Sequence, residues 1–482
     1  MHRMDQILRL GLACLLIGGA AQTGLPLAAR AQATQPPATT APTQAASAPA
    51  APQGPLTLKT VLLYALANNQ QIAITRFDER TGEEKIKEAR SQALPQVNAT
   101  GLFQDNVQKQ VLVLPPGLNF PGADGKPIPI SLTYQLTAQA TLDQKIFDQS
   151  VFTALKAARA GTAYYKMHTQ LTETQVIEQV AQVYYKAQVT GTQVAVLDSN
   201  IANISKVMES TQAQFQLGLA RKIDVDRLKV NLTNLNTQRV SLLDSIIQQG
   251  YQLRNLMGMS LDEPLSLEVF APANVENEIG SNVSMDKGLN LNNRLEYTIL
   301  KKQAELEGYQ KKANQAAYYP SLDLQGLYNT NGVSNKLDFV GHGKTAIWYQ
   351  TGYFSLNLKL PIYDGGSRRA KVNEAQIAID QYNKQAEQTA SQLDLDYRNS
   401  KIYLQTSINT IKAQKANLDL AQEVYTVTQS NYSQGLSSLT DLLDAENSYL
   451  QAENNYNGAL LQYKLAEIGL IKANGNLQSL LN

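Results

Sequence analysis

The sequence contains two copies of one pattern, and this repeat constrains the fold more than any other feature of the chain. The segment Leu94–Phe103 reappears 225 residues later as Tyr319–Tyr328, with its proline and glycine in the same places. A second motif joins an aromatic residue, a Gly-Leu pair and an aspartate six residues after the glycine. It occurs at Phe215–Asp224 and again, 217 residues later, at Tyr432–Asp441. Because internal repeats determine architecture before local signals do, we expect two structurally equivalent halves.

The N-terminus has the pattern of a secretory signal peptide. Arg3 and Arg9 form a short basic region, Leu10–Ile17 is apolar, and Ala29-Arg30-Ala31 supplies a small-residue cleavage site. The following segment is rich in Ala, Pro and Thr and is typical of a flexible leader. We divide the chain into signal peptide, leader, first repeat, second repeat and C-terminal tail: residues 1–31, 32–55, 56–282, 283–475 and 476–482.

Composition excludes several classes of function. The 482 residues carry a formal net charge of +1, which gives no indication of a nucleic-acid partner. Cys14 lies inside the expected signal peptide, so the mature chain has no disulfide and no cysteine metal site. The three histidines form no metal-binding spacing with carboxylates, and no nucleophile motif is present. We therefore expect neither an enzyme nor a bound cofactor.

Four segments alternate between apolar and polar residues, as strands with two different faces do. They lie at about residues 97–105, 134–142, 322–329 and 348–360, with Leu102 and Leu327 as exceptions to the alternation. Strands of roughly nine residues can cross a bilayer when tilted, although a soluble sheet has the same pattern. Four strands cannot close a barrel, and lipid does not tolerate an open edge. If the strands span a membrane, several chains must share one barrel, and three chains would supply twelve strands.

The remaining sequence is predicted to be helical. Two stretches, about residues 149–216 and 367–433, would form helices roughly 100 Å long. Each reverses at a Gly-Leu pair, Gly218-Leu219 or Gly435-Leu436. The helices that follow carry apolar residues at steps of three and four over four heptads, which predicts coiled-coil packing, although a soluble helical bundle has the same period. The fold class is therefore mostly α, with long coiled-coil hairpins and membrane-type strands.

These features together resemble the TolC family of outer-membrane efflux proteins, over nearly all of residues 56–475. The most specific motif is Tyr432-x-x-Gly435-Leu436-x-x-Leu439-x-Asp441-Leu442-Leu443-Asp444-Ala445, and Leu360-Pro361-Ile362-Tyr363-Asp364-Gly365-Gly366 is another. The resemblance implies a homotrimer with a 12-stranded β-barrel in the outer membrane of a Gram-negative bacterium and a 12-helix α-barrel through the periplasm. It implies a passive exit duct that docks on a periplasmic adaptor and an inner-membrane pump of RND, ABC or MFS type.

The same resemblance places Asp441 and Asp444 at the periplasmic entrance. They are three residues apart and so share one helix face, and three chains would form two rings of three carboxylates. Such rings attract cations, disfavour anions and can bind divalent ions at a constriction. The alternative is that both are ordinary solvated carboxylates at a helix start.

The family also closes its entrance with bonds between neighbouring hairpins. Asp224 and Tyr432 match two of the positions involved. The third, usually basic, falls on Ser437, so two alternatives stay open: the lock is weaker, or it uses Arg221 or Lys222 from the facing tip. A local turn role for Asp224 and Tyr432 is the alternative. The expected adaptor contacts are the two tips: Gly218, Leu219, Ala220, Gly435, Leu436 and Ser437.

Two other hypotheses remain open at this stage. A periplasmic adaptor or coiled-coil scaffold would also be rich in heptads, but an adaptor usually has one hairpin, and this chain has two. A dedicated type I secretion duct would share the whole fold and differ only in its partner.

Overall fold

The computed structural model describes residues 54–115, 126–280, 288–339 and 345–481. The expected signal peptide and nearly all of the leader lie outside these residues. Within them, no helix is both long enough and apolar enough to cross a membrane. The described residues form two compact units, one built around a β-sheet and one built from long helices.

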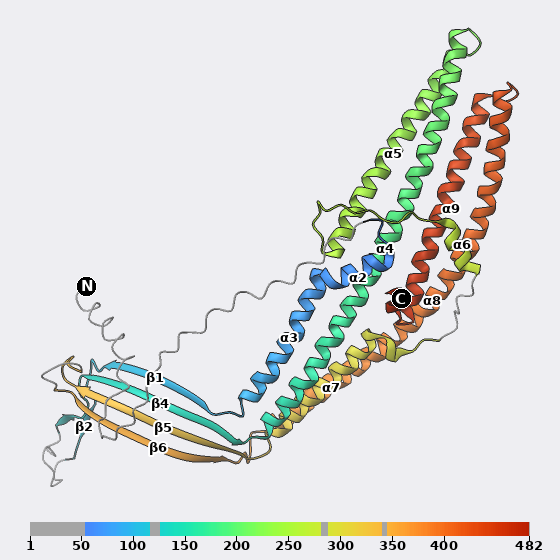
Figure 1. Ribbon diagram of the computed structural model, residues 1–482. Helices are drawn as coiled ribbons and strands as arrows, with labels where there is room; N and C mark the ends of the chain where they lie inside the picture. Colours follow the sequence, from blue (N-terminus) through green and yellow to red (C-terminus); the bar gives the residue numbers. More distant parts are fainter. Residues whose placement is uncertain (1–53, 116–125, 281–287, 340–344, 482) are drawn as a thin grey trace, which may run out of the picture. The chain divides into compact units, whose positions relative to one another are not determined.

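The β unit comprises Ile86–Leu155 and Lys312–Lys371 and contains an antiparallel sheet in the order β1-β4-β5-β6 (Figure 1). Its strands are β1 Gln96–Asp105, β4 Tyr134–Phe147, β5 Ser321–Ser334 and β6 Ile347–Lys359. Each repeat contributes one hairpin, β1–β4 or β5–β6, and the pairing of β4 with β5 joins the two repeats. The first hairpin also carries a small ribbon, β2 Val111–Val113 with β3 Pro127–Pro129. β4 and β5 continue beyond residues 142 and 329, where the expected strands end.

The register of the sheet places apolar residues on one face and polar residues on the other. One row across the sheet is Val97, Leu142, Gly326 and Phe354, and a row on the opposite face is Thr100, Gln139, Asn329 and Thr351. Side chains two residues apart on a strand share a face. Leu102 and Leu327, which break the alternation, therefore lie on the polar face, each two residues from one of its polar members.

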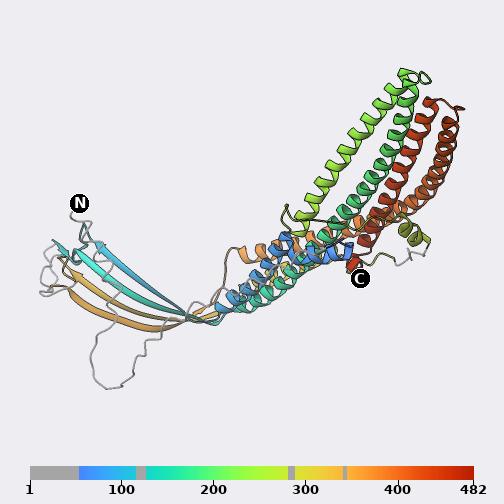
Figure 2. The ribbon, with the colours of Figure 1, turned by 45° about the horizontal axis from the view of Figure 1, so that its top comes forward.

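The helical unit contains two hairpins, which lie side by side in both views (Figures 1 and 2). The first pairs α4 Gln149–Gln216 with α5 Lys222–Met257, and the second pairs α8 Ser367–Ser433 with α9 Leu439–Ala473. With 68 and 67 residues, α4 and α8 are the expected long helices. The shorter elements are α2 Leu58–Asn68, α3 Gln70–Ser91, α6 Pro272–Gly280, η1 Leu291–Asn293, α7 Leu295–Ala316 and η2 Leu477–Leu481.

The heptad residues form the helical core. Three buried apolar clusters run along the unit, and the one nearest the hairpin reversals draws residues from α4, α5, α8 and α9. We call it the tip cluster: Leu197, Ile204, Leu228, Leu232, Leu235, Tyr425, Leu439, Leu442, Ala445 and Leu450. Leu228, Leu232 and Leu235 follow the three-four spacing of α5, and Leu442 and Ala445 follow that of α9. The coiled-coil pattern thus packs the two repeats against each other.

Replacing Leu228 by alanine should destabilise the helical unit. The side chain is 0 % exposed in the tip cluster, so Leu228→Ala removes buried methyl groups and leaves a cavity, at a cost of about 2–5 kcal/mol. Leu228→Met keeps the volume and should cost less than about 1.5 kcal/mol. Thermal denaturation of the purified protein, followed by circular dichroism, measures both. Equal midpoints for the two variants would contradict tight packing at this position.

Candidate functional site

The two hairpin reversals have the same backbone geometry. Gly218 and Gly435 both have φ +74°, a left-handed conformation that glycine adopts without a Cβ penalty. After each glycine the leucine N–H donates to a carbonyl five residues back, Leu219 to Gln214 at 2.8 Å and Leu436 to Asn431 at 2.8 Å. Each glycine N–H donates to a carbonyl three residues back. This pair of bonds defines the Schellman helix end, so the Gly-Leu repeat of the sequence is a repeated structural motif.

The aspartate six residues after each glycine also makes an equivalent contact. In the first tip Asp224 accepts two bonds from the Arg221 guanidinium, at 2.9 and 3.1 Å. In the second tip Asp441 accepts from the Ser438 backbone N–H at 2.9 Å and from its hydroxyl at 2.7 Å. In both tips the residue that bonds the aspartate lies three positions after the glycine. It is the cation Arg221 in the first tip and the neutral capping residue Ser438 in the second.

Asp441 is thus part of a capping box that starts α9, since its own N–H donates back to Ser438 Oγ. The hydrogen bonds from Ser438 lower the pKa of Asp441, which keeps this carboxylate charged. Asp444 is exposed on the same helix, and within the described part of the chain no hydrogen bond or ion pair engages its carboxylate. The structure therefore brings both charges to the first turns of α9 and leaves them without a cation.

The two tips carry opposite charge. Residues 217–229 contain four basic and two acidic side chains, whereas the equivalent residues 434–446 contain three acidic and no basic ones. Arg221 corresponds to Ser438 and Arg227 to Asp444 when the glycines are aligned. Similar turns thus present different electrostatic surfaces, and the second tip, whose exposed charges are Asp441 and Asp444, is the one suited to cations.

The two expected lock residues have separate partners within one chain. Tyr432 lies partly buried, with its hydroxyl 3.1 Å from the hydroxyl of Thr211 on α4, while Asp224 is held by Arg221. The structure does not bring Asp224 and Tyr432 together. Ser437 supplies no cation, and Arg221 is already engaged. Any Asp224–Tyr432 contact would have to form between copies of the chain.

The expected adaptor-contact residues form the outermost turns of the hairpins. Leu219 and Leu436 are 77 % and 74 % exposed, and a Cβ built on Gly218 or Gly435 would meet no other atom within 4 Å. Ala220 and Ser437 are half-buried beside them. Each tip thus offers a free leucine on a rigid backbone turn.

Sequence reasoning missed Glu446, two residues after Asp444. Its side chain is 0 % exposed beside the tip cluster, and its one hydrogen bond comes from Asn231 Nδ2 at 3.4 Å. Burial raises the pKa of Glu446 to about 7, against a smaller lowering by Asn231. The sequence holds one signal for this site, a charged residue directly after the heptad residue Ala445. Its burial could not be predicted, because it depends on which helices pack together.

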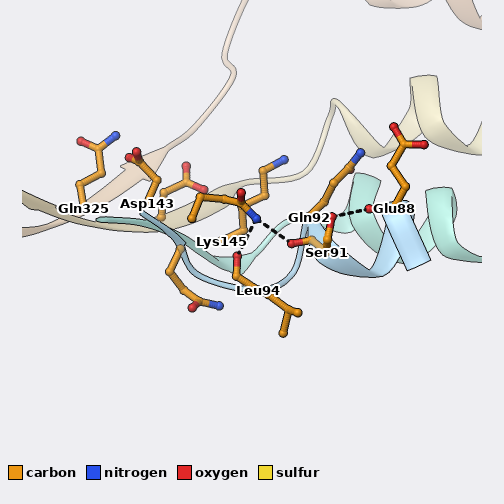
Figure 3. Close-up of a pocket in the computed structure, with 10 residues that line it drawn as sticks. Glu88, Ser91, Gln92, Leu94, Asp143, Lys145 and Gln325 are labelled. Atoms are coloured by element: carbon orange, nitrogen blue, oxygen red, sulfur yellow. Dashed lines mark hydrogen bonds between the residues drawn. The ribbon is translucent and has the colours of Figure 1, made fainter. Parts of the chain in front are cut away.

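A cavity of about 490 Å³ lies in the β unit, apart from the predicted site residues (Figure 3). Glu88, Asp143, Lys145 and Asp323 contribute charged side chains to its lining. The Gln96 amide donates to the carbonyls of Ser91 and Leu94 at its edge, fixing the turn before β1. None of the residues expected to act in the gate, the lock or the adaptor contact lines it.

Comparison with known proteins identifies the family. The profile of the outer membrane efflux proteins matches residues 61–259 and 291–476, one match in each repeat. The chain belongs to this family. The outer membrane protein TolC of Vibrio cholerae is 22 % identical over 424 residues, which cover 87 % of this chain and 91 % of TolC.

Solved structures show the same fold. A CusC structure matches with a TM-score of 0.66 at 18 % identity, covering 86 % of this chain and 91 % of CusC. The Campylobacter jejuni CmeC outer membrane channel matches with a TM-score of 0.64 at 18 % identity, covering 87 % and 86 %.

Membership in the family confirms the main expectations. The protein is an outer-membrane duct of efflux or secretion systems in a Gram-negative bacterium, and it is not an enzyme. It has the mostly α fold of the trimeric TolC-like channels, with a four-stranded main sheet in the described part of the chain, and works together with an efflux system. The adaptor or scaffold hypothesis is therefore set aside in favour of the duct.

The stability of the efflux protein should depend on a residue that tolerates left-handed backbone conformation at each tip. Gly435→Ala places a Cβ on backbone with φ +74° and should cost about 1–2 kcal/mol, whereas Gly435→Asn should cost less because asparagine tolerates this region. The Cβ itself has open space, so the difference reports backbone strain alone. Thermal denaturation of both variants tests this, and a more stable alanine variant would refute the assigned turn.

Stability should also depend on the protonation of Glu446. Its pKa in the folded protein lies above the ordinary 4.5, so the fold is favoured at low pH and loses stability as pH rises from about 4.5 to about 7. The loss approaches about 3 kcal/mol per chain. Glu446→Gln removes this contribution. The difference in denaturation midpoint between wild type and variant should therefore grow across this window and stay constant above it; a constant difference throughout would contradict the raised pKa.

Proposed function

We propose that the second hairpin tip is the cation-selective entrance gate of this outer-membrane duct. Asp441 and Asp444 of three copies would form two stacked rings of three carboxylates. The observation that carries this proposal is the charge of the tip. Its two exposed carboxylates are paired with no cation among the described residues, whereas the first repeat has Arg221 beside its aspartate and Arg227 in place of Asp444.

The electrostatic argument is direct. Like charges gathered around a narrow opening repel one another unless a counter-ion sits between them, so they attract cations and disfavour anions. In the described part of one chain, no group of three or more His, Cys, Asp or Glu side chains is placed to hold a metal ion. A divalent ion at this gate would therefore need carboxylates from several copies.

Closure of the gate would use contacts between neighbouring copies. Asp224 and Tyr432 are the proposed lock, with Lys222, which is exposed on the basic first tip, as the cation that Ser437 does not supply. Forming the lock would exchange existing bonds, Asp224 with Arg221 and Tyr432 with Thr211, for new ones. Because bonds would be exchanged and not added, the open and closed states would have similar free energies, as suits a gate.

Partners would dock at the tips. The exposed leucines Leu219 and Leu436, presented on Schellman turns, would contact the hairpins of a periplasmic adaptor. The helical unit would then lie in the periplasm. An inner-membrane pump of RND, ABC or MFS type would supply the energy, since the duct itself carries no catalytic residue in this proposal.

Removing the Asp444 charge should weaken cation binding at the gate. Single-channel current in a planar bilayer, with added Mg²⁺, is compared between wild type and Asp444→Asn. We expect cation selectivity to fall and the half-blocking Mg²⁺ concentration to rise roughly tenfold, which corresponds to about 1.4 kcal/mol. Asp444 is chosen because, unlike that of Asp441, its carboxylate makes no hydrogen bond within the described part of the chain. The added change Asp441→Asn should enlarge the effect.

The matched control is Asp396→Asn, which removes an exposed carboxylate from the middle of α8. It should leave both selectivity and block unchanged. If Asp396→Asn and Asp444→Asn alter the current equally, the effect is one of net charge, and the gate does not lie at the second tip.

A further inference from the structure

Glu446 is a buried carboxylate that the proposed gate does not use. It projects from α9 toward α5, where Asn231 Nδ2 donates to its Oε2 at 3.4 Å, and its Oε1 has no hydrogen-bond partner. Leu228 and Leu442, which stand one helical turn before Asn231 and Glu446, are fully buried and apolar members of the tip cluster. A carboxylate is thus enclosed by hydrocarbon with one weak polar contact.

Such a group does not stabilise the fold. Burying a polar group costs free energy unless its hydrogen bonds are completed, and one oxygen of Glu446 lacks a partner. The raised pKa of this carboxyl reflects the same cost. The groups that face it are the Asn231 amide from α5 and the Tyr425 phenol from α8, whose own pKa is raised by burial and by the Glu446 charge. From α4 the cluster receives Leu197 and Ile204, and within the described residues no ion pair engages Glu446, so its burial is not offset by a cation.

A buried polar contact can, however, select one arrangement of the helices over others. In a heptad seam the apolar residues recur, so several registers bury similar area, and a polar pair selects one of them. Helices α5 and α9 both start at a hairpin tip and run away from it. Two polar contacts join them there: the exposed Arg227 guanidinium donates to Thr440 Oγ1 at 2.7 Å, and Asn231 donates to Glu446.

We propose that Glu446, through Asn231, is a positioning residue for the entrance gate: it fixes the rotation and register of α9 against α5 and thereby aims Asp441 and Asp444. The inference rests on the proposed gate for its functional part. Glu446 follows Asp444 by two residues on one helix, so any rotation of α9 about its axis turns both carboxylates with it. Its role is geometric and is carried by the contact between the two repeats.

The test measures helix register and gating separately. Arg227→Cys and Thr440→Cys are introduced together, since these side chains touch across α5 and α9 and Cys14, the one native cysteine, lies in the expected signal peptide. A short bis-maleimide reports whether the two helices keep their register in the purified trimer. Without the cysteines, Mg²⁺ block and thermal midpoint are measured for Glu446→Leu, Glu446→Gln and Asn231→Leu. The matched control is Glu423→Leu, which makes the same change on the exposed face of α8.

We expect Glu446→Leu and Asn231→Leu to lose the crosslink and to shift Mg²⁺ block in the same direction as Asp444→Asn. Glu446→Leu should keep or raise the thermal midpoint. Glu446→Gln, which can still accept the bond from Asn231, should restore both the crosslink and the block, and Glu423→Leu should change neither. A crosslink retained in Glu446→Leu, or a loss that Glu446→Gln does not rescue, would overturn the positioning role. If the crosslink is lost as expected but Asp444→Asn leaves block unchanged, the positioning role stands and the gate proposal fails.

Discussion

The unpaired backbone at the edges of the four-stranded sheet is the constraint on which the rest of the structure depends. β1 and β6 are edge strands within one chain, each bonded to a neighbour on one side only. In hydrocarbon, every backbone N–H and C=O must be paired, so an outer-membrane sheet of four strands is viable only when other copies complete it. Threefold assembly satisfies this, and closed symmetry then repeats every residue of the helical hairpins three times. The threefold assembly that pairs the sheet edges also brings together three copies of each exposed carboxylate, such as Asp444.

Local rules account for the part of this architecture that sequence alone predicts. The Gly-Leu pairs mark helix reversals because the turn requires φ of +74°, which Gly218 and Gly435 adopt at no steric cost. Alternation predicts strands because the faces of this sheet differ in polarity, and Leu102 and Leu327 are exceptions that no local rule foresees. β4 and β5 are longer than alternation predicts, because their last residues are held by pairing with the neighbouring strand. For the same reason, the partners of Asp224, Tyr432 and Glu446 follow from tertiary neighbours that the sequence does not specify.

The two repeats have the same turn geometry at their tips but different charge. Both tips retain the glycine, the leucine and the aspartate that shape the turn. The residue three positions after the glycine is free to differ, because either Arg221 or Ser438 can hold the aspartate that follows. Arginine neutralises Asp224, and serine caps the helix and leaves Asp441 charged. This exchange, together with others such as Arg227 against Asp444, makes one tip basic and the other acidic while the turn geometry is kept.

The same seam that holds the hairpins together cannot, by itself, place them accurately. A slip of one heptad along α5 preserves the apolar pattern but moves α9 by about 10 Å, at 1.5 Å per residue. Asp441 and Asp444 are three residues apart, about 4.5 Å along the helix, so such a slip exceeds the spacing within the proposed gate. Hydrophobic burial in the tip cluster makes the hairpins stable, whereas in the positioning role proposed above a directional contact, Asn231 with Glu446, sets where the carboxylates lie. A duct whose selectivity depends on rings of charge therefore needs buried polar contacts that its stability alone would not favour.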